Sequence, residues 1–144
     1  MSTKRVGPDE LGIDVAKGTD TAAFRWLVAC LLFGNRISQD IAARAYAELD
    51  KLHVLTPEKL AKADWQALVD ALGRGGYKRY DESTARELIG LGKQVHDEYG
   101  GHLTRIKRDV HSRKELTERA QEFKGIGPTT SQIFTRELAP AWGF

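Results

Sequence analysis

The length and composition of the chain exclude several classes of protein. Of its 144 residues, 41% are hydrophobic and 29% are charged, which is typical of one folded domain and argues against disorder. Because Cys30 is the only cysteine, the chain cannot hold an internal disulfide framework, a four-cysteine zinc site or a four-cysteine iron–sulfur cluster. The 22 basic and 20 acidic residues leave a net charge of +2, so a surface that binds a polyanion must come from local clustering.

The amino-terminal segment, residues 1–18, is mostly polar, and we expect a weakly ordered lead-in with a short docking turn around Ile13. It lacks the apolar core of a signal peptide. The most apolar run, residues 22–33, carries Arg25 and is too short to span a bilayer. A single cysteine fits a reducing compartment. We therefore expect a cytoplasmic protein without a membrane partner, associated with the nucleoid in a prokaryote, and one domain over residues 19–144.

The pattern of residues 19–144 predicts an all-α domain of seven or eight helices, because no stretch alternates as a strand would. Apolar side chains between residues 22 and 33 recur three and four positions apart, and others occupy the opposite side of the same helix. A helix that is apolar nearly all round is usually the central helix of a bundle. We expect this helix to end at Gly34.

Capping residues predict where the next helices begin. Ser38 can accept a hydrogen bond at the start of one helix, and Asp64 can do so at the start of another. Thr56 followed by a proline is also typical of a helix start. We expect the helix after Asp64 to break at the glycines of residues 73–76, and a long helix to follow over residues 82–99.

Two further helices frame a glycine turn near the carboxyl end of the chain. Ser112 begins the sequence of a capping box at the start of the first helix. Pro128 opens the second helix, directly after Gly125, Ile126 and Gly127. The two glycines permit a tight turn, and we expect Ile126 to anchor that turn in the core.

The amide groups of this turn predict a phosphate-binding site. We expect the N–H groups of Gly127 and of the first helical turn after it to point outward, where the helix dipole favours an anion. The hydroxyls of Thr129 and Thr130 can add donors. With Gly125 and Ile126, these residues would bind a DNA phosphate without reading the base sequence. A plain turn between helices is the alternative, because Gly-x-Gly tripeptides are common.

Four motifs follow one another in the chain and together suggest a family. They are the apolar residues 27–32, Asn35 with Arg36, the glycine-rich residues 72–78 followed by Ala85, and the turn of residues 123–131. In this order they resemble the helix–hairpin–helix DNA glycosylases of the endonuclease III type. The matching parts of that family are its buried second helix, its DNA-probing loop, its central Gly-x-x-x-x-Lys-Ala segment and its hairpin. Here extra residues precede the alanine. The resemblance covers most of the chain and implies base-excision repair, in which a flipped base enters a pocket and a carboxylate supports its departure.

Two departures from the family concern its chemistry. Bifunctional members carry a hairpin lysine that attacks the sugar, and the matching residue here is Thr129, which cannot form the imine. The catalytic aspartate of the family would fall just beyond Phe144, and Glu137, the only acid after the hairpin, comes too early. The chain is therefore either a fragment or a member without that carboxylate, and we expect it to release little or no base.

We expect no cofactor and no metal. The carboxy-terminal cysteines that bind an iron–sulfur cluster in some members of the family are absent, and a monovalent cation at the hairpin is left open. The four histidines lack cysteine partners and the spacing of ligands, so we predict no zinc site. Cys30 lies within an apolar helix, and we expect an inert core thiol.

Three other segments are candidate DNA contacts. Asn35 and Arg36 lie between two helices, from which a loop can probe or wedge into a duplex. The loop of residues 74–79 combines cations that can follow phosphates with an aromatic ring that can stack on an unpaired base, namely Arg74, Lys78, Arg79 and Tyr77. The basic residues between 102 and 114 can extend this surface. For each segment, a solvated connection or face is the alternative.

From these features we expect a monomeric DNA-binding protein of base-excision repair, whose partner is double-stranded DNA, damaged DNA included. Two alternatives remain: a non-catalytic helix–hairpin–helix module that binds DNA, and an α-helical protein-interaction domain that contains a glycine turn. Affinity for DNA that falls steeply with salt separates the first two functions from the third. Release of a damaged base separates the first function from the second.

Overall fold

The structure, a computed structural model, describes residues 6–144, and within this range it confirms the predicted all-α fold. It contains seven α-helices and four short 3-10 helices, and these described residues form no strand. The α-helices are α1 (Asp20–Phe33), α2 (Gln39–Lys51), α3 (Pro57–Ala61), α4 (Trp65–Arg74), α5 (Asp81–Tyr99), α6 (Arg113–Ala120) and α7 (Pro128–Leu138). The 3-10 helices are η1 (Asp9–Leu11), η2 (Val15–Lys17), η3 (Leu103–Arg108) and η4 (Ala139–Trp142). Among these helices, none is both long and apolar enough to cross a membrane.

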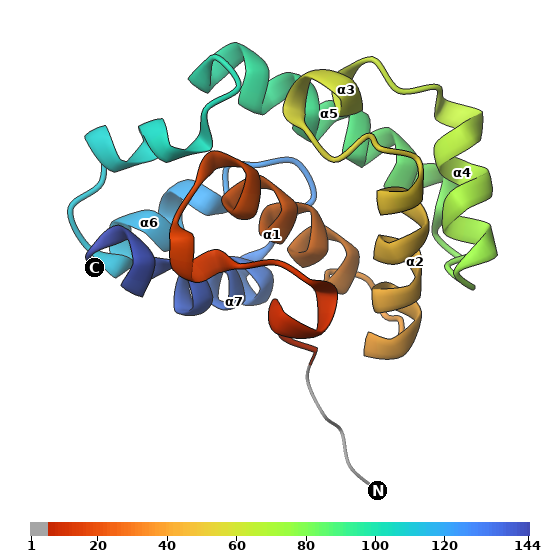
Figure 1. The fold of residues 1–144 in the computed structure, drawn as a ribbon, viewed down its shortest axis with the longest axis horizontal. Helices are drawn as coiled ribbons and strands as arrows, with labels where there is room; N and C mark the ends of the chain where they lie inside the picture. Colours follow the sequence, from red (N-terminus) through yellow and green to blue (C-terminus); the bar gives the residue numbers. More distant parts are fainter. Residues whose placement is uncertain (1–5) are drawn as a thin grey trace, which may run out of the picture.

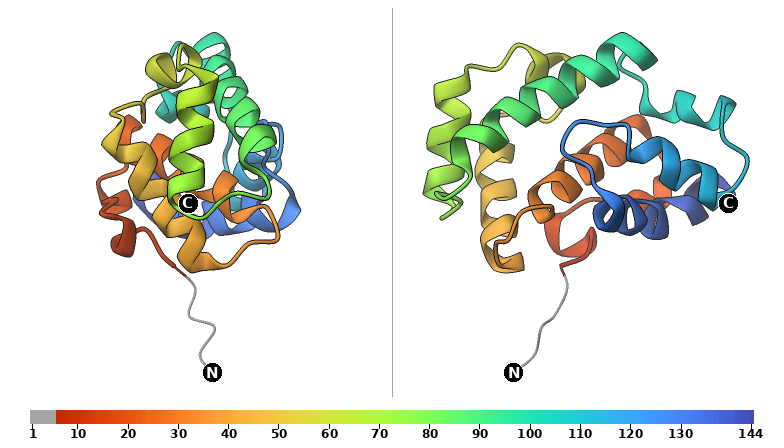
Figure 2. Two further views of the ribbon diagram at one scale, coloured as in Figure 1. Left: turned by 90° about the vertical axis from the view of Figure 1, so that its right-hand side faces the viewer. Right: turned by 180° about the vertical axis from the view of Figure 1, so that it is seen from behind.

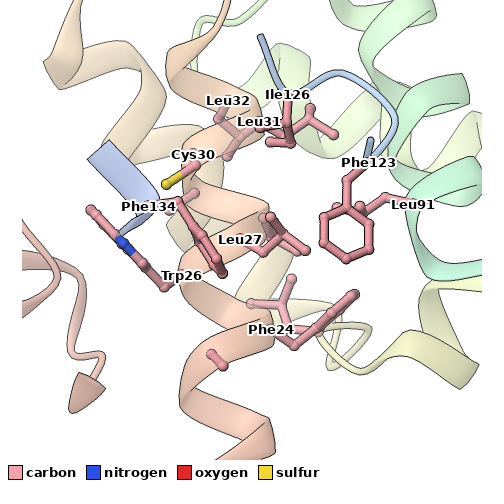
Figure 3. Close-up of a cluster of buried hydrophobic side chains, with 14 of the residues drawn as sticks. Phe24, Trp26, Leu27, Cys30, Leu31, Leu32, Leu91, Phe123, Ile126 and Phe134 are labelled. Carbon is pink, nitrogen blue, oxygen red and sulfur yellow. The ribbon is translucent and has the colours of Figure 1, made fainter. Parts of the chain in front are cut away.

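Helix α1 runs through the middle of the molecule, as its apolar surface predicts. The helices α2 to α5 pack together on one side of it, and α6 and α7 pack together on the other (Figures 1 and 2). Figure 3 shows Leu27 of α1 pointing toward Leu91 and Phe123, whereas Cys30 lies beside Phe134 of α7. Each of these side chains is at most 3% exposed. The two groups of helices therefore share one core, with α1 at its centre.

The predicted helix caps are confirmed at four helix starts. Ser38, Thr56 and Asp64 each accept a hydrogen bond from the N–H group three residues later, at 3.2, 3.2 and 3.0 Å. Ser112 does the same for α6 at 3.1 Å, but the carboxylate of Glu115, the last residue of the capping box, accepts from the N–H of His111 instead of that of Ser112. The local sequence therefore sets the start of these four helices, while the reciprocal bond of the capping box at α6 shifts by one residue.

Glycines at the end of α4 and within α5 permit close packing between helices. Helix α4 ends at Arg74, within the glycine-rich residues 73–76 where the sequence predicts a break. A Cβ atom on the next residue, Gly75, would lie 2.6 Å from the backbone nitrogen of Ala45 in α2. Helix α5 is unbroken, and a Cβ on its Gly92 would lie 2.7 Å from a backbone nitrogen of α3. Both positions exclude a side chain, because the backbone of a neighbouring helix lies too close to the glycine.

The segment of residues 6–18 packs onto the helical domain. Ile13 is 2% exposed and belongs to the core, and the indole nitrogen of Trp142 donates to the carbonyl of Gly18 at 3.0 Å. The weak order that the polar composition predicts therefore does not apply to this part of the lead-in. The rest of the lead-in, residues 1–5, lies outside the described residues.

Candidate nucleic-acid interface

The predicted hairpin consists of α6, the turn of residues 121–127, and α7. Ile126 is 5% exposed, so the prediction that it anchors the turn in the core is confirmed. Gly125 has φ of +78°, a backbone conformation that favours glycine. A Cβ atom there would also lie 3.0 Å from the side chain of Leu31 and 3.1 Å from Oε2 of Glu87. Backbone conformation and space together require glycine at this position.

The donors at the start of α7 differ from those predicted. The N–H of Gly127 donates to the hydroxyl of Thr130 at 3.0 Å, so it is not an outward donor for an anion. The same hydroxyl donates to the carbonyl of Gly127 at 3.3 Å, and the Thr130 residue is buried, so its hydroxyl is not free either. The backbone N–H groups of Thr129 and Thr130 have no acceptor among residues 6–144. These two amides, with the exposed hydroxyl of Thr129, are the available donors.

A shallow hollow of about 170 Å³ opens at this helix start. Its lining combines hairpin residues with the residue that ends α1: Gly34, Gly125, Gly127, Pro128, Thr129 and Thr130. A Cβ on Gly34 would lie 3.4 Å from the carbonyl oxygen of Gly125. The loop that follows α1 is therefore directly beside the hairpin, although about 90 residues of sequence separate them.

The two residues of the predicted probing loop have different environments. Asn35 uses its side-chain amide internally, because Nδ2 donates to the hydroxyl of Tyr77 at 3.0 Å and to that of Thr84 at 3.1 Å. Arg36 is exposed. Asn35 therefore supports the loop from within, and Arg36 is the residue of this pair that is exposed to solvent.

The basic loop of residues 74–79 does not offer an aromatic ring to a base. Tyr77 is fully buried, and its hydroxyl donates to the carbonyl of Leu32 at 2.7 Å, so the predicted stacking of Tyr77 on a base is wrong. The ring packs in the core, and the surrounding glycines and cations in the sequence do not indicate this burial. Burial raises the pKa of Tyr77.

The cations of the same loop are solvent-exposed, but one is paired. Arg74 makes an ion pair with Glu48 at 3.0 Å. Lys78 and Arg79 are exposed, and the guanidinium of Arg79 lies 5.5 Å from the centre of the Tyr80 ring. Two cations of this loop thus remain available to a phosphate.

Part of the basic segment between residues 102 and 114 has structural partners. Arg105 donates to the carbonyl of Tyr99 at 3.2 Å, and Arg113 donates to that of Phe144 at 3.1 Å. Nδ1 of His102 lies 2.9 Å from Oδ2 of Asp20. These contacts hold the first part of η3 and the carboxyl-terminal residue, so only some of the predicted basic face is without a structural partner.

One face of α5 supports the hairpin, although no pattern in the sequence predicts this role. The side chain of Gln94 bonds the hairpin backbone at two positions, the carbonyl of Glu122 and the N–H of Lys124. Glu87, two turns earlier, lies against Gly125. Partial burial raises the pKa of Glu87, although Lys124 opposes this shift. A long helix with two internal glycines carries no local pattern that marks such contacts.

The remaining candidate groups do not form a second site. Glu137 lies in α7, and a rise of 1.5 Å per residue places it about 12 Å along the helix from Thr129. Its carboxylate contacts the neighbouring Arg136 at 3.3 Å. Cys30 is fully buried, and burial raises the pKa of its thiol well above the ordinary value. Within residues 6–144, no cluster of three or more histidine, cysteine or acidic side chains could hold a metal ion.

Comparisons with protein-family models and with curated proteins identify no relative. No protein-family model matches the chain. No curated protein matches it significantly. The function is therefore argued from the hairpin and its surroundings.

Proposed function

We propose that the protein binds double-stranded DNA through the phosphate backbone, with the start of α7 as its main contact. The observation that carries this proposal is the pair of open amides at Thr129 and Thr130, which face a hollow at a helix amino terminus. Such amides bind a phosphate oxygen because hydrogen bonding and the helix dipole act together. The contact is independent of base sequence.

Exposed cations near the same face support the proposal. Arg36 follows Gly34, which lines the hollow, and Lys124 immediately precedes Gly125 in the turn. Both side chains are exposed. Cations beside amide donors add the charge neutralisation that supplies most non-specific affinity for DNA.

We place this binding activity in base-excision repair, as the resemblance to the endonuclease III type implies. Threonine at position 129 cannot attack the sugar, so lyase chemistry through that residue is excluded. Glu137 is about 12 Å along α7 from Thr129, which is too far for a carboxylate acting beside the hairpin. This separation favours the second candidate function, a DNA-binding module without catalysis.

The test of DNA binding is Gly127→Val, measured by titration of a short duplex at several salt concentrations. A Cβ at Gly127 would meet no atom within 4 Å, and φ is −95°, so valine fits without disturbing the fold. Gly127 lines the hollow, so the branches of valine would add bulk beside it. Gly73→Val in α4 is the matched control, because a Cβ there also meets no atom within 4 Å.

We expect wild-type affinity to fall as salt rises, with a log–log slope of about −0.9 for each phosphate contact. Gly127→Val should weaken binding about tenfold or more, which corresponds to about 1.4 kcal/mol, while Gly73→Val binds as the wild type does. Unchanged affinity of folded Gly127→Val would refute the hairpin assignment.

Catalysis is tested separately, in single-turnover incubations with duplexes that carry uracil, oxidised pyrimidine or mismatched adenine. We expect no rapid release of any of these bases. Rapid release that Glu137→Gln abolishes would show instead that the acid inside α7 is catalytic.

A further inference from the structure

The amide side chain of Gln94 connects α5 to both sides of the hairpin turn. Its Nε2 atom donates to the carbonyl of Glu122 at 2.8 Å, and its Oε1 atom accepts from the N–H of Lys124 at 3.0 Å. Between these two backbone groups lies Phe123, whose ring is 3% exposed and belongs to the core. The part of the turn immediately before Gly125 is therefore held both by the buried ring of Phe123 and by the hydrogen bonds from Gln94.

Two further residues of α5 contact the same turn. The side chain of Lys124 lies over Gly90, where a Cβ atom would be 3.4 Å from Cγ of the lysine. The carboxylate of Glu87 lies against Gly125. Residues 87, 90 and 94 are three and four positions apart, so they share one face of the helix. Of these three residues, Gln94 alone makes hydrogen bonds to the turn.

We propose that Gln94 is a positioning residue for phosphate binding by the hairpin, an inference that rests on the proposed function. An unsupported turn loses conformational freedom when it binds, and each backbone residue that becomes fixed costs free energy. The two bonds from Gln94 fix the turn beforehand, which raises affinity without any contact to the ligand. Gln94 does not touch DNA.

The proposed role requires a side chain at position 94 that is as long as glutamine and carries both a hydrogen-bond donor and an acceptor. Methionine has a similar length and provides neither group. Glutamate keeps the acceptor for the N–H of Lys124, but its ionised carboxylate faces the carbonyl of Glu122 without a proton to donate. Protonated glutamate regains that donor. The variants Gln94→Met and Gln94→Glu therefore separate the two bonds from simple packing.

The experiment measures duplex affinity and urea unfolding for both variants beside the wild type. Gln66→Met is the control, because Gln66 bonds Asp70 on its own helix, α4, at 2.9 Å. At pH 7 we expect folded Gln94→Met and Gln94→Glu to bind duplex DNA about tenfold more weakly than the wild type. We expect Gln66→Met to bind as the wild type does.

A pH series then gives a readout that a purely structural role would not change. Lowering the pH toward about 4.5, near the ordinary pKa of glutamate, should restore the affinity of Gln94→Glu relative to the wild type, but not that of Gln94→Met. Charged groups near this position are Glu87 and Glu98 on α5 and Glu122 and Lys124 on the hairpin. These groups are the same in all the proteins, so the ratio of each variant's affinity to that of the wild type at each pH isolates residue 94.

The outcomes separate this inference from the proposed function. If the wild type binds DNA and Gly127→Val does not, but Gln94→Met binds as the wild type does, the positioning role is refuted while the proposed function holds. A lower unfolding free energy with unchanged affinity also refutes it. If the wild type binds no duplex at any salt concentration, both proposals fail.

Discussion

Replacing Tyr77 with phenylalanine removes one buried oxygen atom and leaves the ring in place. The hydroxyl donates to the carbonyl of Leu32 at 2.7 Å and accepts from Nδ2 of Asn35 at 3.0 Å. Leu32 is in the last turn of α1, where carbonyl groups have no N–H partner within the helix. In the wild type the Tyr77 hydroxyl supplies that partner, because the surrounding core excludes water.

The cost of Tyr77→Phe follows from which groups lose their partners. The carbonyl of Leu32 becomes a buried acceptor without a donor, whereas Asn35 keeps its bond to Thr84 at 3.1 Å. One orphaned buried group costs about 1–3 kcal/mol, so we expect the free energy of unfolding to fall by about 2 kcal/mol. At about 3 °C for each kcal/mol in a domain of this size, Tm should fall by about 6 °C.

Urea unfolding of Tyr77→Phe beside Tyr80→Phe tests this reasoning. The hydroxyl of Tyr80 makes no hydrogen bond to any of residues 6–144, and its residue is only partly buried, so Tyr80→Phe should be nearly neutral. We expect the midpoint for Tyr77→Phe to fall by about 1 M with an unchanged m value, if m is about 2 kcal/mol per molar urea. A difference from the wild type below about 0.5 kcal/mol, as for ordinary surface changes, would refute the assigned role of the hydroxyl.

Three further predictions concern charge and chemistry. Partial burial would raise the pKa of Asp20, but bonds from Thr104 and His102 outweigh it and lower that pKa. Asp20 therefore stabilises the fold at neutral pH, and this effect is lost as the pH falls below the ordinary pKa of an aspartate. In urea unfolding from pH 7 to pH 3, Asp20→Asn should be less stable than the wild type at pH 7, and its stability should depend less on acid. The pKa of Glu87 is raised, mainly by burial, so its effect on stability is the opposite: the free energy of unfolding falls as the pH rises above the ordinary pKa of a glutamate. Glu87→Gln should therefore be more stable than the wild type at pH 7, and it should bind DNA more tightly. Borohydride should trap no adduct with abasic DNA, because Thr129 has no amine, and an adduct mapped to any lysine would contradict this.

Helix positions could be predicted because their causes are local in the sequence. Ser38, Thr56 and Asp64 each act on an N–H three residues later, so the sequence alone contains both partners. The effect of Gly92 was not local. Its intrinsic preference weakens a helix, but the approach of α3 makes a side chain impossible there, and packing outweighs preference.

The turn at the candidate site could be predicted in position, but its open hydrogen-bond donors could not. The sequence from Gly125 to Thr130 predicts a tight turn before a helix, and the turn is there. Which amides stay open depends on the rotamer of Thr130, which captures the N–H of Gly127. The burial of Tyr77 depends on contacts with residues that are 42 and 45 positions away in the sequence. The local composition of a basic glycine loop therefore suggested an exposed ring, whereas the ring is buried.

Helix α5 determines the distance between the two parts of the proposed interface. Thr84 of α5 accepts from Asn35 and so anchors the loop that presents Arg36. Ten residues later, Gln94 holds the hairpin turn. At 1.5 Å per residue these anchors are about 15 Å apart on one rigid helix. Groups so far apart with no shared partner act independently, so the effects of losing each anchor on DNA affinity should add as free energies. Under the proposed function, a duplex that contacts both Arg36 and the start of α7 meets a spacing that α5 has fixed before binding, whereas two flexible loops would have to lose that freedom in the complex.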